Sequence, residues 1–348
     1  MLGIVSKYLN QSQVRRRMPF MNELPTGPSL PDFRDRRTSL IVFGILVILL
    51  GCLCALMVPL MLLGQSMAAR QGGTVNGQTM IPAVLTYLTL AAALIWLGIG
   101  SIMVRRWARA LLLILAWSWL VVGIFTSVSM FFVVPRMMAT IPPGPRVIAI
   151  SVMLVFLAVI FLAIPGILVI YYQNKNVKAT CEAHDPVTRW TDRCPLPALA
   201  LSVWLGLGAL SMLMMPLAYH SVLPVFGVLI SGLPGTIVFL ALAGLWGYLA
   251  RAAYQLKPAA WWITVAMLVL LTVSNVVTFS RIDLAELYRL MGYTEQQIDQ
   301  IASFSFFSSK TMVWWSALFC LPLFGYLLGV KRYFTRPAAA EFTSPPPP

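Results

Sequence analysis

Eight long apolar stretches dominate the sequence and limit the chain to a fold that crosses a membrane. They lie near 39–64, 80–104, 108–134, 147–172, 198–219, 223–250, 259–280 and 311–330. About 20 mostly apolar residues cross roughly 30 Å of hydrocarbon as a helix, in which every backbone polar group has a partner. Only 10% of the residues are charged, which excludes an ordinary water-soluble domain. The sequence therefore predicts an all-α integral membrane protein with eight transmembrane helices, and the lipid bilayer is its expected partner.

The distribution of basic residues predicts which way the chain crosses the membrane. In this topology nineteen of the 25 Lys and Arg residues lie on one side and six on the other. Because basic residues are retained in the cytoplasm, both termini are expected there, with a basic arm at 1–38 and a proline-rich tail at 331–348. The compact chain favours a bacterial inner membrane. Its net charge of +14 is spread between apolar runs, so nucleic acid is not an expected partner.

Three pairs of prolines indicate that the chain contains one four-helix unit twice. The pairs are Pro59 with Pro216, Pro82 with Pro234, and Pro165 with Pro322. Since proline removes a backbone donor and bends a helix, these six residues are predicted helix kinks at matching depths. The predicted units are 39–172 and 198–330, joined by a cytoplasmic linker at 173–197. Four spans in each unit make the repeats parallel; the alternative is that proline is simply common in membrane helices.

Carboxylates are missing from the predicted spans, and this limits the possible chemistry. All eleven Asp and Glu residues lie in arms or loops. Ion-coupled carriers and intramembrane hydrolases normally need ionisable groups at depth, so both classes are disfavoured. The sequence also lacks Walker, HExxH and GxSxG motifs, which argues against an enzyme. No cofactor is expected.

Uncharged polar side chains within two spans form the candidate ligand-binding site. They are Thr272, Ser274, Asn275 and Thr278 in the seventh span, and Thr126 and Ser129 in the third. A buried carboxamide without partners is costly in lipid, so Asn275 should face protein or a wet cavity. One hypothesis is a polar niche between the two units for an uncharged ligand. The alternative is that these groups only form hydrogen bonds within and between helices.

Sulfur side chains in the first span are of the kind that binds Cu(I). Cys54, Met57 and Met61 share one helix face, but Cys52 lies about 200° from Cys54 around the helix. The corresponding fifth span lacks both cysteines. These side chains are therefore interpreted as packing residues, and no metal is predicted here.

The linker carries a second group of residues that can ligate metals. Cys181, His184 and Cys194 could bind zinc, but the pattern lacks a paired CxxC knuckle. The alternative is that Trp190 lies at the membrane interface while Arg189 and Arg193 meet lipid phosphates. Whether the linker binds a metal is left open.

The segment 281–310 is predicted to form two short amphipathic helices on the side opposite the termini. The first is expected to end at Gly292, and Thr294 is expected to cap the second together with Gln297. Such a hairpin could cap a vestibule, dock a membrane or extracytoplasmic protein, lie on the bilayer, or pack on its own bundle.

These features support a leading functional hypothesis and one alternative. The leading hypothesis is non-enzymatic binding or passage of a neutral or lipid-like molecule between the two repeats. The alternative is a non-catalytic subunit or scaffold of a larger membrane assembly.

Overall fold

The computed structural model describes residues 34–70, 80–138, 142–218, 221–303 and 309–335. Residues 1–35 and 36–348 form two separate units, and all the helices and strands described below belong to the second. Most of the predicted basic arm and of the predicted proline-rich tail lie outside the described residues. Arg37 already belongs to the first described helix, and the last one extends to Thr335.

Eight helical segments in the described ranges are long and apolar enough to cross a membrane, which confirms the predicted number of spans. The fourth span consists of two α-helices joined by a π-helical turn, and the other seven are single helices. The spans are α2 (Arg37–Arg70), α3 (Ile81–Ile102), α4 (Arg106–Met137), α5 (Pro143–Ala158) with η3 (Val159–Ala163) and α6 (Ile164–Gln173), α8 (Leu196–Ala218), α9 (Gly232–Tyr254), α10 (Pro258–Arg281) and α13 (Ser309–Thr335). The chain is therefore a multi-pass membrane protein built from α-helices.

A short β-hairpin replaces the expected start of the sixth span. Strands β1 (Leu223–Val225) and β2 (Val228–Ile230) pair antiparallel, and α9 begins only at Gly232. Phe226 and Gly227 both have positive φ angles, of 49° and 85°. Two such residues form the type I′ turn that suits the twist of a two-residue hairpin. The sequence predicted that the sixth span begins at residue 223. This prediction is wrong for 223–231, which contains the hairpin.

Within the described ranges, four shorter helices connect the spans. They are α7 (Lys175–His184), the 3₁₀ turn η4 (Trp190–Asp192), α11 (Leu284–Leu290) and α12 (Glu295–Ser303). The two amphipathic helices expected in 281–310 are thus present. Gly292 follows α11 with a φ of 88°, and the N–H of Gln297 donates to Thr294 Oγ1 at 3.4 Å, which confirms the predicted cap.

Two turns of the same kind connect α3 to α4 and α9 to α10. Val104 and Leu256 have φ angles of 54° and 56°, which is uncommon for residues other than glycine. In each turn the N–H of this residue and that of the next, Arg105 or Lys257, donate to carbonyls in the last turn of the preceding helix. This is the Schellman pattern, and it closes both helices in one conformation.

Two hydrophobic clusters hold the helices together. The first contains Leu40, Leu113 and Tyr172 and joins α2, α3, α4, α6 and α7. The second contains Leu249 and Trp261 and joins α8, α9, α10 and α13 to one side of α4. The helices accordingly form two groups, and α4 packs in both clusters.

Two contacts from α4 tie the groups together. The indole Nε1 of Trp204 on α8 donates to Ser118 Oγ at 2.9 Å. The rings of Phe125 on α4 and Phe319 on α13 meet edge to face, with centroids 5.4 Å apart. The two groups therefore touch at the middle part of α4, from Ile114 to Phe125.

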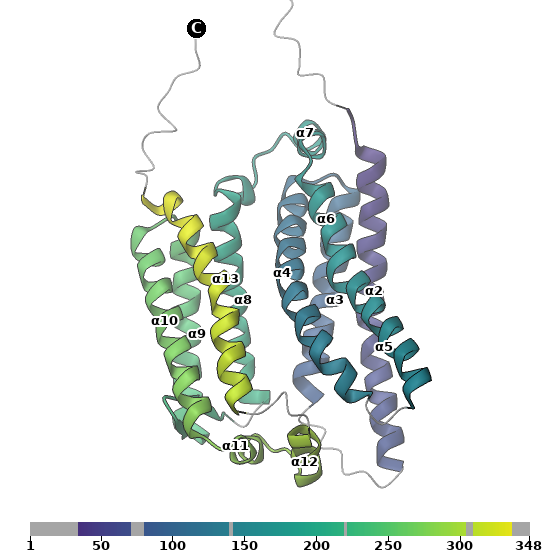
Figure 1. The fold of residues 1–348 in the computed structure, drawn as a ribbon. Helices are drawn as coiled ribbons and strands as arrows, with labels where there is room; N and C mark the ends of the chain where they lie inside the picture. The colour runs from purple at the N-terminus through teal and green to yellow at the C-terminus, as the bar shows by residue number, and fades with distance from the viewer. Residues whose placement is uncertain (1–33, 71–79, 139–141, 219–220, 304–308, 336–348) are drawn as a thin grey trace, which may run out of the picture. The chain divides into compact units, whose positions relative to one another are not determined.

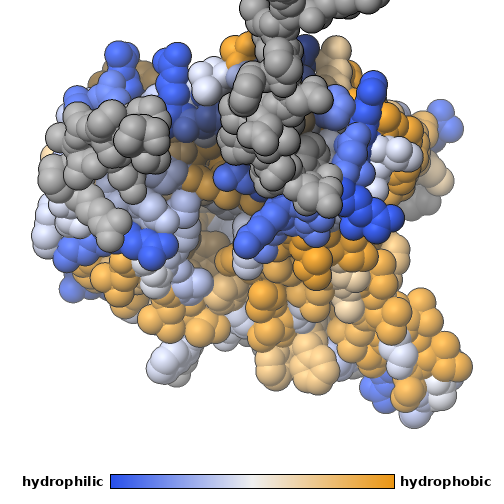
Figure 2. Space-filling view, turned by 90° about the horizontal axis from the view of Figure 1, so that it is seen from above, coloured by the Kyte–Doolittle hydropathy of each residue, from blue (hydrophilic) through white to orange (hydrophobic). Residues whose placement is uncertain are grey.

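The ends of the spans differ in their loops (Figure 1). The start of α2, the end of α13 and helix α7 lie at one end, and α11 and α12 lie at the other. Figure 2 looks onto the α7 end and shows hydrophilic residues gathered over the helix ends, with hydrophobic residues on the flanks. The start of α2 and the end of α13 therefore lie at the same end of the spans, as an even number of spans requires.

Candidate functional site

The polar residues predicted on α10 mainly hold the β-hairpin in place. The N–H of Phe226 donates to Ser274 Oγ at 3.1 Å, and that of Gly227 donates to Thr278 Oγ1 at 3.2 Å. Both hydroxyl-bearing residues are buried. Two of the predicted ligand-binding residues therefore have backbone partners at the tip of a turn, and those partners lie about fifty residues away in sequence.

The two other polar residues on this part of α10 have different surroundings. Thr272 Oγ1 donates to the carbonyl of Leu268 at 2.7 Å and lies 3.1 Å from Cys320 Sγ on α13. Asn275 is exposed, so its carboxamide can reach a molecule outside the described chain. Of the four residues, Asn275 has the surroundings that suit a ligand contact best.

The hydroxyls on α4 lie at the depth of the α4–α5 contact. Ser129 Oγ donates to Phe125 O at 2.8 Å within its own helix. Thr126 is half-buried. Ser127 Oγ is buried and has no hydrogen-bond partner among the described residues. This oxygen is a polar group that the sequence analysis did not assign to the ligand site.

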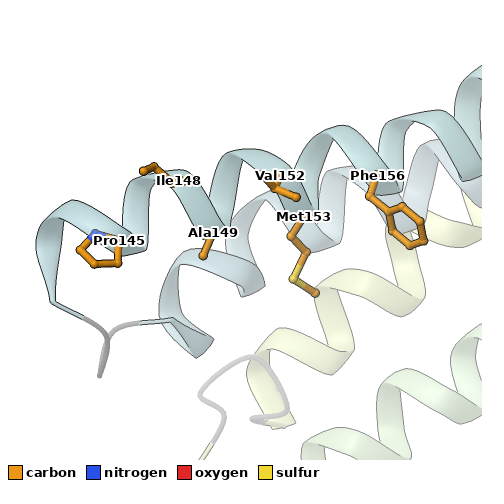
Figure 3. Close-up of a pocket in the computed structure, with 6 residues that line it drawn as sticks. All are labelled: Pro145, Ile148, Ala149, Val152, Met153 and Phe156. Atoms are coloured by element: carbon orange, nitrogen blue, oxygen red, sulfur yellow. The ribbon is translucent and has the colours of Figure 1, made fainter.

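An open apolar groove of about 510 Å³ runs along α5. Six side chains line it on one side of this helix (Figure 3): Pro145, Ile148, Ala149, Val152, Met153 and Phe156. No residue of α5 is buried, and Ile148 is 67% exposed. On a membrane-spanning segment, an exposed apolar stripe of this kind is covered by lipid or by another apolar molecule.

The π-helical turn explains why α5 diverges from the helices around it. Pro165 has no N–H, so the carbonyl of Phe161, four residues earlier, loses its usual helical donor. That carbonyl approaches α4 at Gly123, where an added Cβ would lie 2.1 Å from the oxygen. Glycine at position 123 therefore leaves room for this carbonyl, and the π-helical turn lies at the contact between α4 and η3.

The six predicted kink prolines occupy two kinds of position. Pro59, Pro216 and Pro322 lie inside helices, and Pro165 is the second residue of α6, just after η3. By contrast, Pro82 and Pro234 lie in the first turns of α3 and α9. A proline fits there without breaking a helical hydrogen bond, so these two positions are compatible with straight helices.

A buried carboxylate organises the α7 end. Asp185 is only 2% exposed; its Oδ1 lies 3.3 Å from Arg189 Nη2 and 3.5 Å from Arg105 Nη1, and its Oδ2 accepts from the N–H of Arg106 at 3.4 Å. Burial opposes ionisation of this carboxyl. The hydrogen bonds and the neighbouring arginine charges outweigh that effect and hold the pKa of Asp185 below its ordinary value.

The linker residues considered for zinc are kept apart in the structure. Among the described residues, no three His, Cys, Asp or Glu side chains are grouped so that they could hold a metal. Cys181 and Cys194 belong to different hydrophobic clusters. Burial raises the pKa of each thiol to about 11, which disfavours the thiolate that binds metals.

The helices α11 and α12 bury part of their apolar faces. Leu287 and Ile298 are buried, whereas Leu290 remains exposed. Arg289 donates to both carboxylate oxygens of Glu295, at 2.8 and 3.2 Å, and fastens the two helices to each other. At least part of this hairpin therefore packs within the chain itself.

The chain matches no model of a known protein family, no curated protein and no solved structure. Its function must therefore be inferred from its own geometry.

Proposed function

We propose that the protein binds, or lets pass, a neutral or lipid-like molecule in the half of the membrane next to α11 and α12. The groove along α5 would hold the apolar part of this molecule. The hydroxyls of Thr126 and Ser129, on the neighbouring helix α4, would meet its uncharged polar part.

The single observation behind this proposal is the groove itself. It is an open surface of about 510 Å³ along one helix, so a ligand would lie along α5 without being enclosed by it. All of its lining residues are apolar, so a charged ligand would lose its hydration there without compensation. A hydrocarbon chain would cover the stripe at no such cost.

The neighbouring polar groups support an uncharged headgroup or hydroxyl on the same molecule. Helix α4 packs against α5 and carries Thr126 and Ser129. The buried, unpartnered Ser127 Oγ on that helix offers one more hydrogen bond. Hydroxyl groups select such ligands without introducing charge into the membrane.

We also propose that the two helix groups are parallel repeats of one four-helix unit. The matching turns at Val104 and Leu256 support this, because both place a non-glycine residue at positive φ. The close pairing of α2 with α3 and of α8 with α9 also supports it. The excess of basic residues at the α7 end favours a cytoplasmic location for that end, as in a bacterial inner membrane.

Filling the groove tests the proposed function. Ala149→Trp places a large ring in the groove, whereas Val147→Trp adds the same ring at an exposed position that does not line it. Each full-length variant would be extracted with its lipids and examined by native mass spectrometry. We expect Ala149→Trp to lower the amount of retained lipid-like molecule several-fold and Val147→Trp to leave it unchanged. Equal retention by both variants would refute the proposal.

A second candidate function is a non-catalytic subunit of a larger membrane assembly. The observation in its favour is also on α5, which has no buried residue in its 16 residues and so presents a face that a partner helix could cover. The same experiment separates the two functions. A protein bound in fixed stoichiometry, and lost in Ala149→Trp, would favour the subunit.

A further inference from the structure

A cluster of four arginines lies where α4 begins, at the end of the molecule opposite α11 and α12. It consists of Arg105, Arg106, Arg109 and Arg189, and one buried carboxylate, Asp185, contacts three of them. The arginines come from the turn before α4, from α4 itself and from the loop after α7. The chain thus gathers them from positions about eighty residues apart in sequence.

The hydrogen-bonding capacity of the arginine cluster is not used up. The Nε atoms of Arg106, Arg109 and Arg189 are buried and have no hydrogen-bond partner among the described residues. The contacts with Asp185 are long, at 3.3 to 3.5 Å. Because a guanidinium offers five donors and a buried donor without a partner is costly, the cluster lacks acceptor oxygens.

The arginine cluster also carries surplus positive charge. Two further carboxylates stand nearby, Glu182 and Asp192, and both lie within electrostatic reach of Arg109. Glu182 is paired with Lys178 at 3.8 Å, and Asp192 Oδ2 accepts from the N–H of Arg189 at 2.9 Å. With Lys178 counted, five basic side chains face three acidic ones. An anion bound among the arginines would reduce their mutual repulsion.

The arginine cluster lies at the depth where membrane phosphates are found. Arg106 is the first residue of an apolar spanning helix. Trp190, 45% exposed, stands beside the cluster and accepts a hydrogen bond at its carbonyl from Tyr254 Oη at 2.8 Å. Exposed Trp and Tyr side chains are typical of the headgroup region.

We propose that the arginine cluster is a binding site for a phosphate group. Arginine pairs with phosphate through parallel N–H donors, and the unpartnered Nε atoms supply such donors. Two sources share this chemistry, the headgroup of an anionic phospholipid and a free phosphate-bearing solute. This site is separate from the groove along α5, so either proposal can fail without the other.

A charge-matched pair of variants tests the site. Arg106→Gln with Arg109→Gln removes two charges from the cluster, and Arg251→Gln with Lys257→Gln removes two exposed charges near the end of α9. Full-length proteins would be placed in discs of phosphatidylcholine containing one-fifth phosphatidylglycerol and extracted for native mass spectrometry. We expect the cluster variant to retain at least tenfold less phosphatidylglycerol than the wild type, and the control to match the wild type. Equal retention by the two variants would overturn the proposal.

A second measurement distinguishes the two phosphate sources. The melting temperature of the wild type in uncharged detergent would be recorded with added inorganic phosphate, and separately with added phosphatidylglycerol. A rise with inorganic phosphate identifies a site for a free phosphate group, and a rise with phosphatidylglycerol alone identifies a headgroup site. If neither raises the melting temperature of the wild type, the proposal fails.

A third variant protects the test against misfolding. Arg109→Lys keeps the charge and most of the side-chain volume but removes the planar fork. If the cluster binds phosphate through paired donors, this variant keeps the fold and loses part of the retention. A lysine variant that retains phosphatidylglycerol as fully as the wild type would contradict the paired-donor geometry.

Discussion

In both groups of helices, the same kind of turn joins the second span to the third. The last spans of the two groups nevertheless take different courses. The span Pro143–Gln173 bends at η3 before Pro165, whereas α13 continues as an α-helix through Pro322. Gly123 and Asn275 each lie nineteen residues after the turn that precedes their helix, at Val104 and Leu256. Gly123 lets the Phe161 carbonyl approach closely, whereas the corresponding residue on α10, Asn275, is exposed.

This difference teaches that a proline alone does not decide the course of a membrane helix. Proline frees a carbonyl wherever it lies inside a helix. The span opens into a π-helical turn at the place where Gly123 of the neighbouring helix leaves room for the displaced backbone. Substitutions at such contacts should therefore affect the two groups of helices differently.

The largest effect is expected for Gly123→Ala. The new Cβ would lie 2.1 Å from Phe161 O, so α4 and η3 would have to separate. Overpacking of this kind costs about 1–3 kcal/mol, and we expect a value near the upper end. Thermal unfolding in detergent, followed by tryptophan fluorescence, would measure the loss. Gly166→Ala on the same span meets no atom within 4 Å and should not destabilise the protein; a similar loss in both variants would contradict this account.

The next largest effect is expected at the turn that contains Val104. Asp185 holds the turn at Val104 through Arg105 and the N–H of Arg106. Asp185→Asn should lower the free energy of unfolding by about 2 kcal/mol, because charge-assisted hydrogen bonds of a buried carboxylate are lost. Glu182→Gln, which removes an exposed carboxylate paired at 3.8 Å, should change it by less than about 0.5 kcal/mol. Equal effects would show that Asp185 does not brace the turn.

A smaller effect is expected where the β-hairpin meets α10. Thr278→Val removes the acceptor for the N–H of Gly227 and should cost about 1 kcal/mol. Hydrogen exchange at the N–H of Gly227 should become faster. Ser280 Oγ donates to a carbonyl of its own helix, so Ser280→Ala serves as the control and should leave that exchange unchanged. Unaltered exchange in Thr278→Val would mean that the hydroxyl does not anchor the hairpin.

The smallest effect is a dependence of stability on pH. Since the pKa of Asp185 is lower in the folded protein than in the unfolded chain, its contribution is fully present above the unfolded value of about 3.9. The contribution is lost as the pH falls through the folded pKa. We expect the difference in melting temperature between wild type and Asp185→Asn to be constant from pH 7 to 5 and to shrink below pH 4. A difference that shrinks already near pH 6 would point to another titrating group.

Local patterns predicted much of the fold but little of the site. The eight spans, the two amphipathic helices and the Thr294 cap follow from hydropathy and short-range spacing, which require no knowledge of distant contacts. Ser274 and Thr278 were predicted to bind a ligand. In the structure, their hydroxyls accept hydrogen bonds from the N–H groups of Phe226 and Gly227. Those residues lie in a segment whose apolar composition predicts a helix, so nothing in the sequence indicated this contact.

The amino-acid sequence determined by itself that the chain crosses a membrane eight times, because hydrocarbon admits only long apolar segments with internally paired backbones. Tertiary structure alone decided that Pro165 accompanies a bend and Pro322 does not, that α5 presents an open groove, and that Asp185 contacts three arginines. Each of these depends on which residues face one another across helices. Such distances are set by packing, and a hydropathy pattern does not contain them.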